Sequence, residues 1–71
     1  MKLSNGEKIK IIMKRNNITL SKLAEALGTS RQNLTNKFTR DNFSEKEVSE
    51  IAEALGCRVE TVFTLPDGTQ I

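Results

Sequence analysis

Apolar side chains recur at helical spacing in four stretches of the chain, and most of these stretches carry signals for where a helix begins or ends. The second stretch places four residues on one helical face, at i, i+3, i+4 and i+7: Leu20, Leu23, Ala24 and Leu27. Thr19 precedes it as a residue suited to cap a helix. Gly28 follows it, and glycine easily adopts the left-handed conformation that ends a helix. The pattern predicts a helix from Leu20 to Leu27.

Two further helices are preceded by capping boxes, in which a Ser and a Glu three residues apart bond each other's backbone N–H groups. Ser4 and Glu7 predict a first helix over residues 4–16. Ser44 and Glu47 predict another, strengthened by an apolar pair that flanks its start: Phe43 and Val48. Their core-facing residues are expected to be Ile9, Ile12 and Met13 in the first, and Val48, Ile51, Ala52 and Leu55 in the other.

The stretch from Arg31 to Arg40 follows Ser30, a suitable helix cap, but it offers only Leu34 and Phe38 to a core. Its eight other side chains are polar and none is acidic. Arg, Gln and Asn are side chains that read base edges, and Lys, Arg and Thr bind phosphates. Two interpretations follow: a helix that reads nucleic acid, or a polar face that is only solvated.

The last residues change from helical to extended character. Residues 58–63 are expected to form a short fifth helix or turn, with three residues covering the core: Val59, Val62 and Phe63. Pro66-Asp67-Gly68 is a turn signature, and it predicts a small β-hairpin or an extended arm. We therefore divide the chain into a domain, 1–63, and a tail, 64–71. The tail is either a dimerisation arm or a frayed end.

The amino-acid composition argues against several classes of function. A chain of 71 residues suffices for one domain with a modest core. It has one cysteine, Cys57, and no histidine, so no disulfide within the chain, cysteine zinc site or common hydrolytic triad is expected. We expect no enzyme, catalytic residue, metal, cofactor or small-molecule ligand. The longest apolar run is Ile11–Met13, and no signal-peptide segment is evident, so we expect a cytoplasmic protein without a membrane span.

The net charge of +2 hides a strong division along the chain. Residues 1–40 hold nine Lys or Arg and two Glu, a net charge of +7, whereas residues 41–71 hold two basic and seven acidic residues, a net charge of −5. This division predicts one electropositive face for a polyanion, with the acidic part turned away. A membrane surface fits less well than a nucleic acid, because the apolar stripes are needed for the core.

An internal repeat offers two places for a DNA-binding unit. SKLAEALG at residues 21–28 recurs as SEIAEALG at residues 49–56. The stretch after the first copy is basic and free of acids, whereas after the second copy Arg58 is offset by Glu60. Charge therefore favours the first copy for DNA and a structural role for the second.

The motifs LAEALG at residues 23–28, TSRQNL at residues 29–34 and IAEALG at residues 51–56 resemble the Cro/repressor-type (XRE-like) helix-turn-helix family of bacterial and phage regulators. The resemblance implies an all-α, lambda-repressor-like bundle of about five short helices. It also implies sequence-specific binding of double-stranded DNA, usually by a homodimer on a palindromic operator. Two positions depart from the family pattern: Leu20, where Gln is frequent, and Lys37, where an apolar residue is usual.

This resemblance assigns roles to the polar residues. In such proteins the N-terminal part of the second helix of the motif enters the major groove. Here that second helix is the one expected over residues 31–39. We expect four residues to contact base edges: Arg31, Gln32, Thr35 and Asn36. We expect seven to contact the DNA backbone: Thr19, Ser21, Lys22, Asn33, Lys37, Arg40 and Asn42. The alternative is a small helical protein-interaction module, antirepressor- or antitoxin-like, that does not read DNA.

Overall fold

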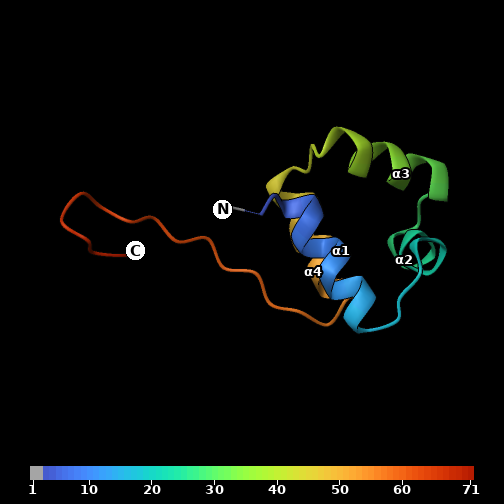
Figure 1. The fold of residues 1–71 in the computed structure, drawn as a ribbon, viewed down its shortest axis with the longest axis horizontal. Coiled ribbons are helices and arrows are strands. Elements are labelled where there is room, and N and C mark those ends of the chain that lie inside the picture. The colour runs from blue at the N-terminus through green and yellow to red at the C-terminus, as the bar shows by residue number, and fades with distance from the viewer. Residues whose placement is uncertain (1–2) are drawn as a thin grey trace.

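The computed structural model describes residues 3–71, which hold four α-helices (Figure 1). These are α1 (Asn5–Arg15), α2 (Leu20–Leu27), α3 (Arg31–Arg40) and α4 (Glu45–Ala54). Helices α1 and α4 lie side by side, and α2 packs against both α3 and α4. The residues after α4 leave this bundle and run outward as an extended segment (Figure 1). We call residues 58–71 the C-terminal arm.

All four helix starts predicted from the sequence are confirmed by side-chain caps. The Ser4 hydroxyl accepts a hydrogen bond from the Glu7 N–H (3.2 Å), and a Glu7 carboxylate oxygen accepts one from the Ser4 N–H (3.0 Å). Ser44 and Glu47 form the same reciprocal pair ahead of α4. The other two caps are single side chains, Thr19 for α2 and Ser30 for α3. Each cap satisfies a backbone donor that the helix itself leaves free.

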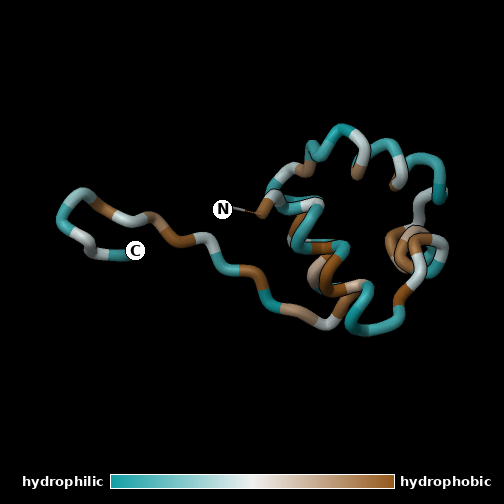
Figure 2. The backbone as a smooth tube through the Cα atoms, in the orientation of Figure 1, coloured by the Kyte–Doolittle hydropathy of each residue, from teal (hydrophilic) through white to brown (hydrophobic). Residues whose placement is uncertain are grey.

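The core lies where the apolar stripes of the four helices meet. Its buried members are Ile9, Met13, Leu23, Ala24, Leu34, Ile51 and Leu55. Leu23 of α2 is the most deeply buried of them, at 1% exposure. Figure 2 shows apolar positions both on the helices and along the arm, and the large apolar side chains of the arm are exposed whereas those of the core are buried. Ile11, which did not fit the predicted stripe of the first helix, is 41% exposed.

The predicted fifth helix over residues 58–63 is wrong. These residues have no helical structure, and the three side chains expected to cover the core are exposed: Val59, Val62 and Phe63. Gly56, at φ 72°, turns the chain after α4, and the Cys57 N–H donates to the Ala52 carbonyl (2.8 Å). The segment beyond is rich in β-branched residues, which favour extended backbone over helix. The described bundle therefore has four helices rather than five.

The arm reverses direction at Pro66–Gly68, as the turn signature predicted. Phe63 and Ile71 exchange two backbone hydrogen bonds (2.8 and 2.9 Å), and the Leu65 N–H donates to the Thr69 carbonyl (2.7 Å). The Asp67 carboxylate accepts from the Thr69 N–H (2.9 Å), which lowers the pKa of Asp67. This pairing amounts to one antiparallel bridge, Thr64 with Gln70, and residues 3–71 contain no β-strand.

None of the helices described here combines the length and the apolar composition that crossing a membrane requires.

Leu23→Ala tests how far the bundle depends on its most buried side chain. Removing a buried isobutyl group leaves a cavity, and we expect the free energy of unfolding to fall by about 2–5 kcal/mol. Because a domain of this size has little stability to lose, the variant should be largely unfolded at 37 °C. Urea unfolding followed by circular dichroism measures the change, with Ala26→Ser on the exposed side of α2 as the control. Equal stability of the two variants would contradict this placement of the core.

Candidate nucleic-acid interface

The turn between α2 and α3 sets the orientation of α3. Gly28 ends α2 in the left-handed conformation (φ 71°), and the Thr29 N–H donates to the Ala24 carbonyl (3.0 Å). The Ser30 hydroxyl then accepts from the Asn33 N–H (3.1 Å) and starts α3. Leu34, 3% exposed, joins α3 to the core. This is a helix-turn-helix, in which α3 is the second helix.

The side of α3 opposite Leu34 carries Gln32 and Asn36, and both side chains are exposed. They lie one helical turn apart, and the Gln32 Nε2 donates to the Asn36 Oδ1 (3.2 Å). Within the described part of the chain this is the hydrogen bond their side chains make, so the fold does not use their amides elsewhere. The outward face of α3 thus presents two adjacent amide groups with free donors and acceptors.

Arg31 and Thr35 flank these amides and differ in exposure and in hydrogen bonding. Arg31 is exposed at the first turn of α3. Thr35 is half-buried, and its hydroxyl donates to the Arg31 carbonyl (2.8 Å). Thr39 repeats this bond to the Thr35 carbonyl (3.0 Å). The hydroxyl hydrogen of Thr35 is therefore engaged, while its methyl group and an oxygen lone pair remain available.

The residues predicted to contact the DNA backbone fall into two groups on either side of α3. Thr19, Ser21 and Lys22 lie at the start of α2. Asn33, Lys37, Arg40 and Asn42 line an open groove of about 420 Å³ between α3 and α4, together with two carboxylates: Glu47 and Glu50. The second group therefore mixes cationic and amide side chains with acidic ones.

Lys37 occupies a position that is partly covered by α4. Its ammonium nitrogen lies 2.7 Å from a carboxylate oxygen of Glu47, and the side chain is 44% exposed. The bond from Lys37, together with those from the Ser44 backbone and hydroxyl, lowers the pKa of Glu47 to about 2. The groove is also lined by Leu34, Phe43 and Ile51, and a lysine can place its apolar stem against such residues while its charge stays in solvent.

The helices differ in the number of acidic residues in their first turns, and this difference favours binding of a polyanion at α2 and α3. Helices α2 and α3 have no acidic residue in their first turn, whereas α1 has Glu7 and α4 has Glu45 and Glu47. A carboxylate in the first turn neutralises the partial positive charge of a helix N-terminus. The N-termini of the helix-turn-helix keep that charge, which favours an approaching phosphate.

A contact that the sequence did not reveal holds the far end of α3. Asp41, in the left-handed conformation at the end of α3 (φ 49°), accepts a hydrogen bond from the Gly6 N–H of α1 (3.0 Å). Nearby, the rings of Phe38 and Phe43 pack edge to face with centroids 5.2 Å apart, and the Lys10 ammonium lies 5.5 Å from the Phe38 centroid. We call the Asp41–Gly6 hydrogen bond the latch.

Gly6 is a glycine because the latch leaves no room for a side chain. A Cβ atom at this position would lie 2.6 Å from the Asp41 carboxylate oxygen. A glycine inside a helix is normally unfavourable by about 1 kcal/mol relative to alanine. That anomaly was the one signal in the sequence that could have pointed to the latch.

If the latch forms, substitutions at its two residues should change the free energy of unfolding by amounts that do not add. Gly6→Ala should lower the free energy of unfolding by about 1–3 kcal/mol despite the better helix propensity of alanine, because the added methyl group displaces Asp41. Asp41→Ala should lower it by about 1–2 kcal/mol through loss of the charged hydrogen bond. The double variant should be at least about 1 kcal/mol more stable than the sum of the two changes predicts. Urea unfolding of the four proteins measures this coupling, and strict additivity would contradict the latch.

The match to known protein families agrees with this geometry. The family described as the Cro/C1-type HTH DNA-binding domain matches residues 8–68, from α1 through α4 and into the arm. Searches of curated proteins and of solved structures found no match. The family match spans the helix-turn-helix together with the elements that hold it in place. The chain therefore belongs to the Cro/C1-type helix-turn-helix family of DNA-binding domains.

Proposed function

We propose that the protein is a transcriptional repressor that occupies a palindromic operator as a homodimer and reads the major groove with the N-terminal half of α3. The observation that carries this proposal is the exposed pair Gln32 and Asn36, whose amides the fold leaves free on a helix without acidic residues. Membership of a family of DNA-binding domains supports the DNA-binding part of this proposal.

The proposed base contacts follow from the chemistry of the exposed side chains. Arg31 can donate two parallel hydrogen bonds to guanine O6 and N7. The Gln32–Asn36 bond opens when either amide pairs with adenine N6 and N7, so the two amides can read neighbouring base pairs. Thr35, with its hydroxyl hydrogen directed to the Arg31 carbonyl, is suited to contact a thymine methyl group.

The proposed phosphate contacts flank this reading surface. Thr19, Ser21 and Lys22 would meet one strand at the N-terminus of α2. Asn33, Lys37, Arg40 and Asn42 would meet the other strand at the α3–α4 groove. Lys37 would exchange its Glu47 partner for a phosphate, whose anionic oxygens accept the same kind of charge-assisted hydrogen bond from its ammonium group.

Two copies are required for a single genomic site to be selected. One recognition helix reads about four to six base pairs, and each correct pair contributes roughly 1–3 kcal/mol of discrimination. A bacterial genome offers on the order of millions of competing positions, which exceeds the discrimination of one such helix. Two half-sites about one helical turn apart supply the difference.

Selection of bound duplexes from a random pool tests the proposal as a whole. We expect an enriched two-fold symmetric sequence whose half-sites lie 10–11 base pairs apart, centre to centre, or a multiple of that distance. Recovery of unenriched sequences, together with no binding at low salt, would contradict the proposal and favour a protein-interaction module.

Arg31→Ala is expected to weaken binding to the selected duplex by about 1–3 kcal/mol and to relax the preference at one base position in each half-site. Fluorescence polarisation with duplexes substituted at each position measures this, and Arg58→Ala on the arm serves as a control with the same loss of charge. A uniform loss over all duplexes would contradict a base-reading role for Arg31.

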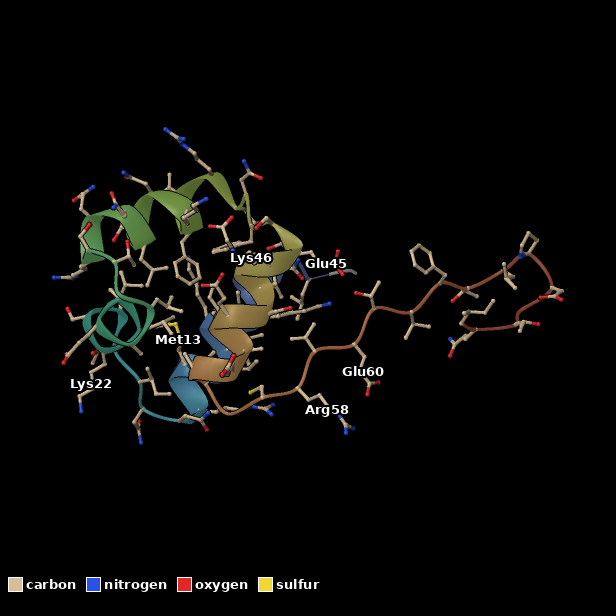
Figure 3. All side chains as sticks on the ribbon, turned by 180° about the vertical axis from the view of Figure 1, so that it is seen from behind. Met13, Lys22, Glu45, Lys46, Arg58 and Glu60 are labelled. Atoms are coloured by element: carbon tan, nitrogen blue, oxygen red, sulfur yellow. The ribbon has the colours of Figure 1, made fainter. Side chains whose placement is uncertain are left out.

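Lys22→Ala should weaken binding to all duplexes alike and reduce the slope of log affinity against log salt by about one for each copy. Lys22 projects from α2 at the end of the molecule away from the arm, whereas Lys46 lies at the start of α4 (Figure 3). Lys46→Ala removes the same charge from the acidic half and should leave the slope unchanged. Equal slopes for wild type and Lys22→Ala would show that Lys22 does not contact a phosphate.

A further inference from the structure

An open hollow of about 310 Å³ lies where α1, α2 and α3 meet, beside the surface that is proposed to read DNA. Thr35, on one side of it, is a proposed base contact. Leu20, on another side, stands in the sequence between two proposed phosphate contacts, Thr19 and Ser21. The residues that line the hollow come from all three helices: Lys10, Met13, Leu20, Thr35, Phe38 and Thr39. The hollow therefore lies between residues assigned to the bases and residues assigned to the backbone.

Lys10 supplies the one side-chain donor of this hollow that the fold leaves free. The hydroxyls of Thr35 and Thr39 each donate to a backbone carbonyl within α3 (2.8 and 3.0 Å). The remaining lining residues have no side-chain N–H or O–H group: Met13, Leu20 and Phe38. An anionic oxygen at the mouth of the hollow can thus be bound by the exposed ammonium group of Lys10.

Phe38 holds this ammonium group in place without neutralising its charge. The Lys10 nitrogen lies 5.5 Å from the centroid of the Phe38 ring, within the range of cation–π attraction. Phe38 is itself packed edge to face against Phe43. The ammonium group has three donors, and those turned away from the ring remain open to an acceptor. A side chain ordered in this way loses less conformational entropy when a ligand arrives.

No carboxylate of the described chain pairs with Lys10. Glu7 precedes it by one helical turn, but a Glu7 carboxylate oxygen accepts from the Ser4 N–H in the cap of α1 (3.0 Å). The ion pairs among residues 3–71 join other side chains: Lys37 with Glu47, and Arg58 with Glu60. A phosphate that approaches Lys10 therefore has no acidic partner to displace.

We propose that Lys10 binds a phosphate of the DNA backbone from α1, at the mouth of the hollow beside Leu20. This inference rests on the proposed function, and it adds α1 to the two groups of phosphate contacts, at the start of α2 and at the α3–α4 groove. Leu20 has no polar side-chain group, so Lys10 supplies the charge at this place. The sequence did not single out Lys10, because its position along α1 does not distinguish it from Lys8.

Lys10→Gln tests the contact, with Lys8→Gln as the matched control. Both remove one exposed charge from α1, but Lys8 lies about 200° away around the helix axis. Lys10→Gln should reduce the slope of log affinity against log salt by about one for each copy, on a duplex of any sequence. Between about 50 and 200 mM salt, the advantage of wild type should shrink roughly threefold for each copy. Lys8→Gln should leave the slope unchanged.

Two results of this titration would overturn the proposal. They are an unchanged slope for Lys10→Gln, and an equal loss of slope for Lys8→Gln. Either result, with salt-dependent binding by wild type, would overturn the Lys10 contact alone. A wild-type protein that binds no duplex at low salt would overturn the proposed function, and the Lys10 contact with it.

Phe38→Leu tests whether the ring holds Lys10, because leucine keeps an apolar side chain but has no aromatic face. In proton NMR spectra of the free protein, the ring should shift the ε-methylene signals of Lys10 upfield of those of Lys8, and Phe38→Leu should abolish this shift. Phe38→Leu should weaken DNA binding about two- to fivefold, and should have little further effect in Lys10→Gln. Circular dichroism checks that the helices remain. No upfield shift in wild type, or full additivity of the two losses, would overturn the role of Phe38.

Discussion

The placement of α3 depends on the burial of Leu34, which the core formed by α2 and α4 holds at 3% exposure. The stripe that α3 offers to the core consists of Leu34 and the half-buried Phe38. Because this stripe is narrow, most of the helix circumference stays in solvent. The narrow apolar stripe that attaches α3 to the bundle therefore also leaves the amides of Gln32 and Asn36 in solvent, where the proposed reading surface needs them.

Besides the burial of Leu34, two further contacts hold α3 in place. The latch fixes the C-terminal end of α3 against α1, and the Lys37–Glu47 ion pair joins the last turn of α3 to α4. With the buried Leu34, these two contacts restrain α3 at three residues. A restrained helix loses less conformational entropy when it enters a groove than a mobile one does. Phe43, whose ring packs edge to face on Phe38, lies beside the latch at Gly6.

The sequence predicted what local rules govern and missed what tertiary contacts decide. Caps such as Ser44 and the turn at Gly28 were confirmed, because each depends on residues within one helical turn. The latch was missed because its two residues are 35 positions apart. The fifth helix was wrong because the apolar spacing of Val59, Val62 and Phe63 fits a helix, while β-branching favours extended chain. The roles assigned to Arg31 and its neighbours remain predictions.

The most direct measurement of the central claim is a DNA titration followed by the side-chain amide signals of Gln32 and Asn36 in ¹⁵N–¹H NMR spectra. A duplex carrying a selected half-site should shift both signals strongly, while those of Asn16 and Gln70, which lie outside the helix-turn-helix, stay nearly unchanged. If Gln32 and Asn36 kept their free-state positions at saturating duplex, the outward face of α3 would not be the surface that reads DNA.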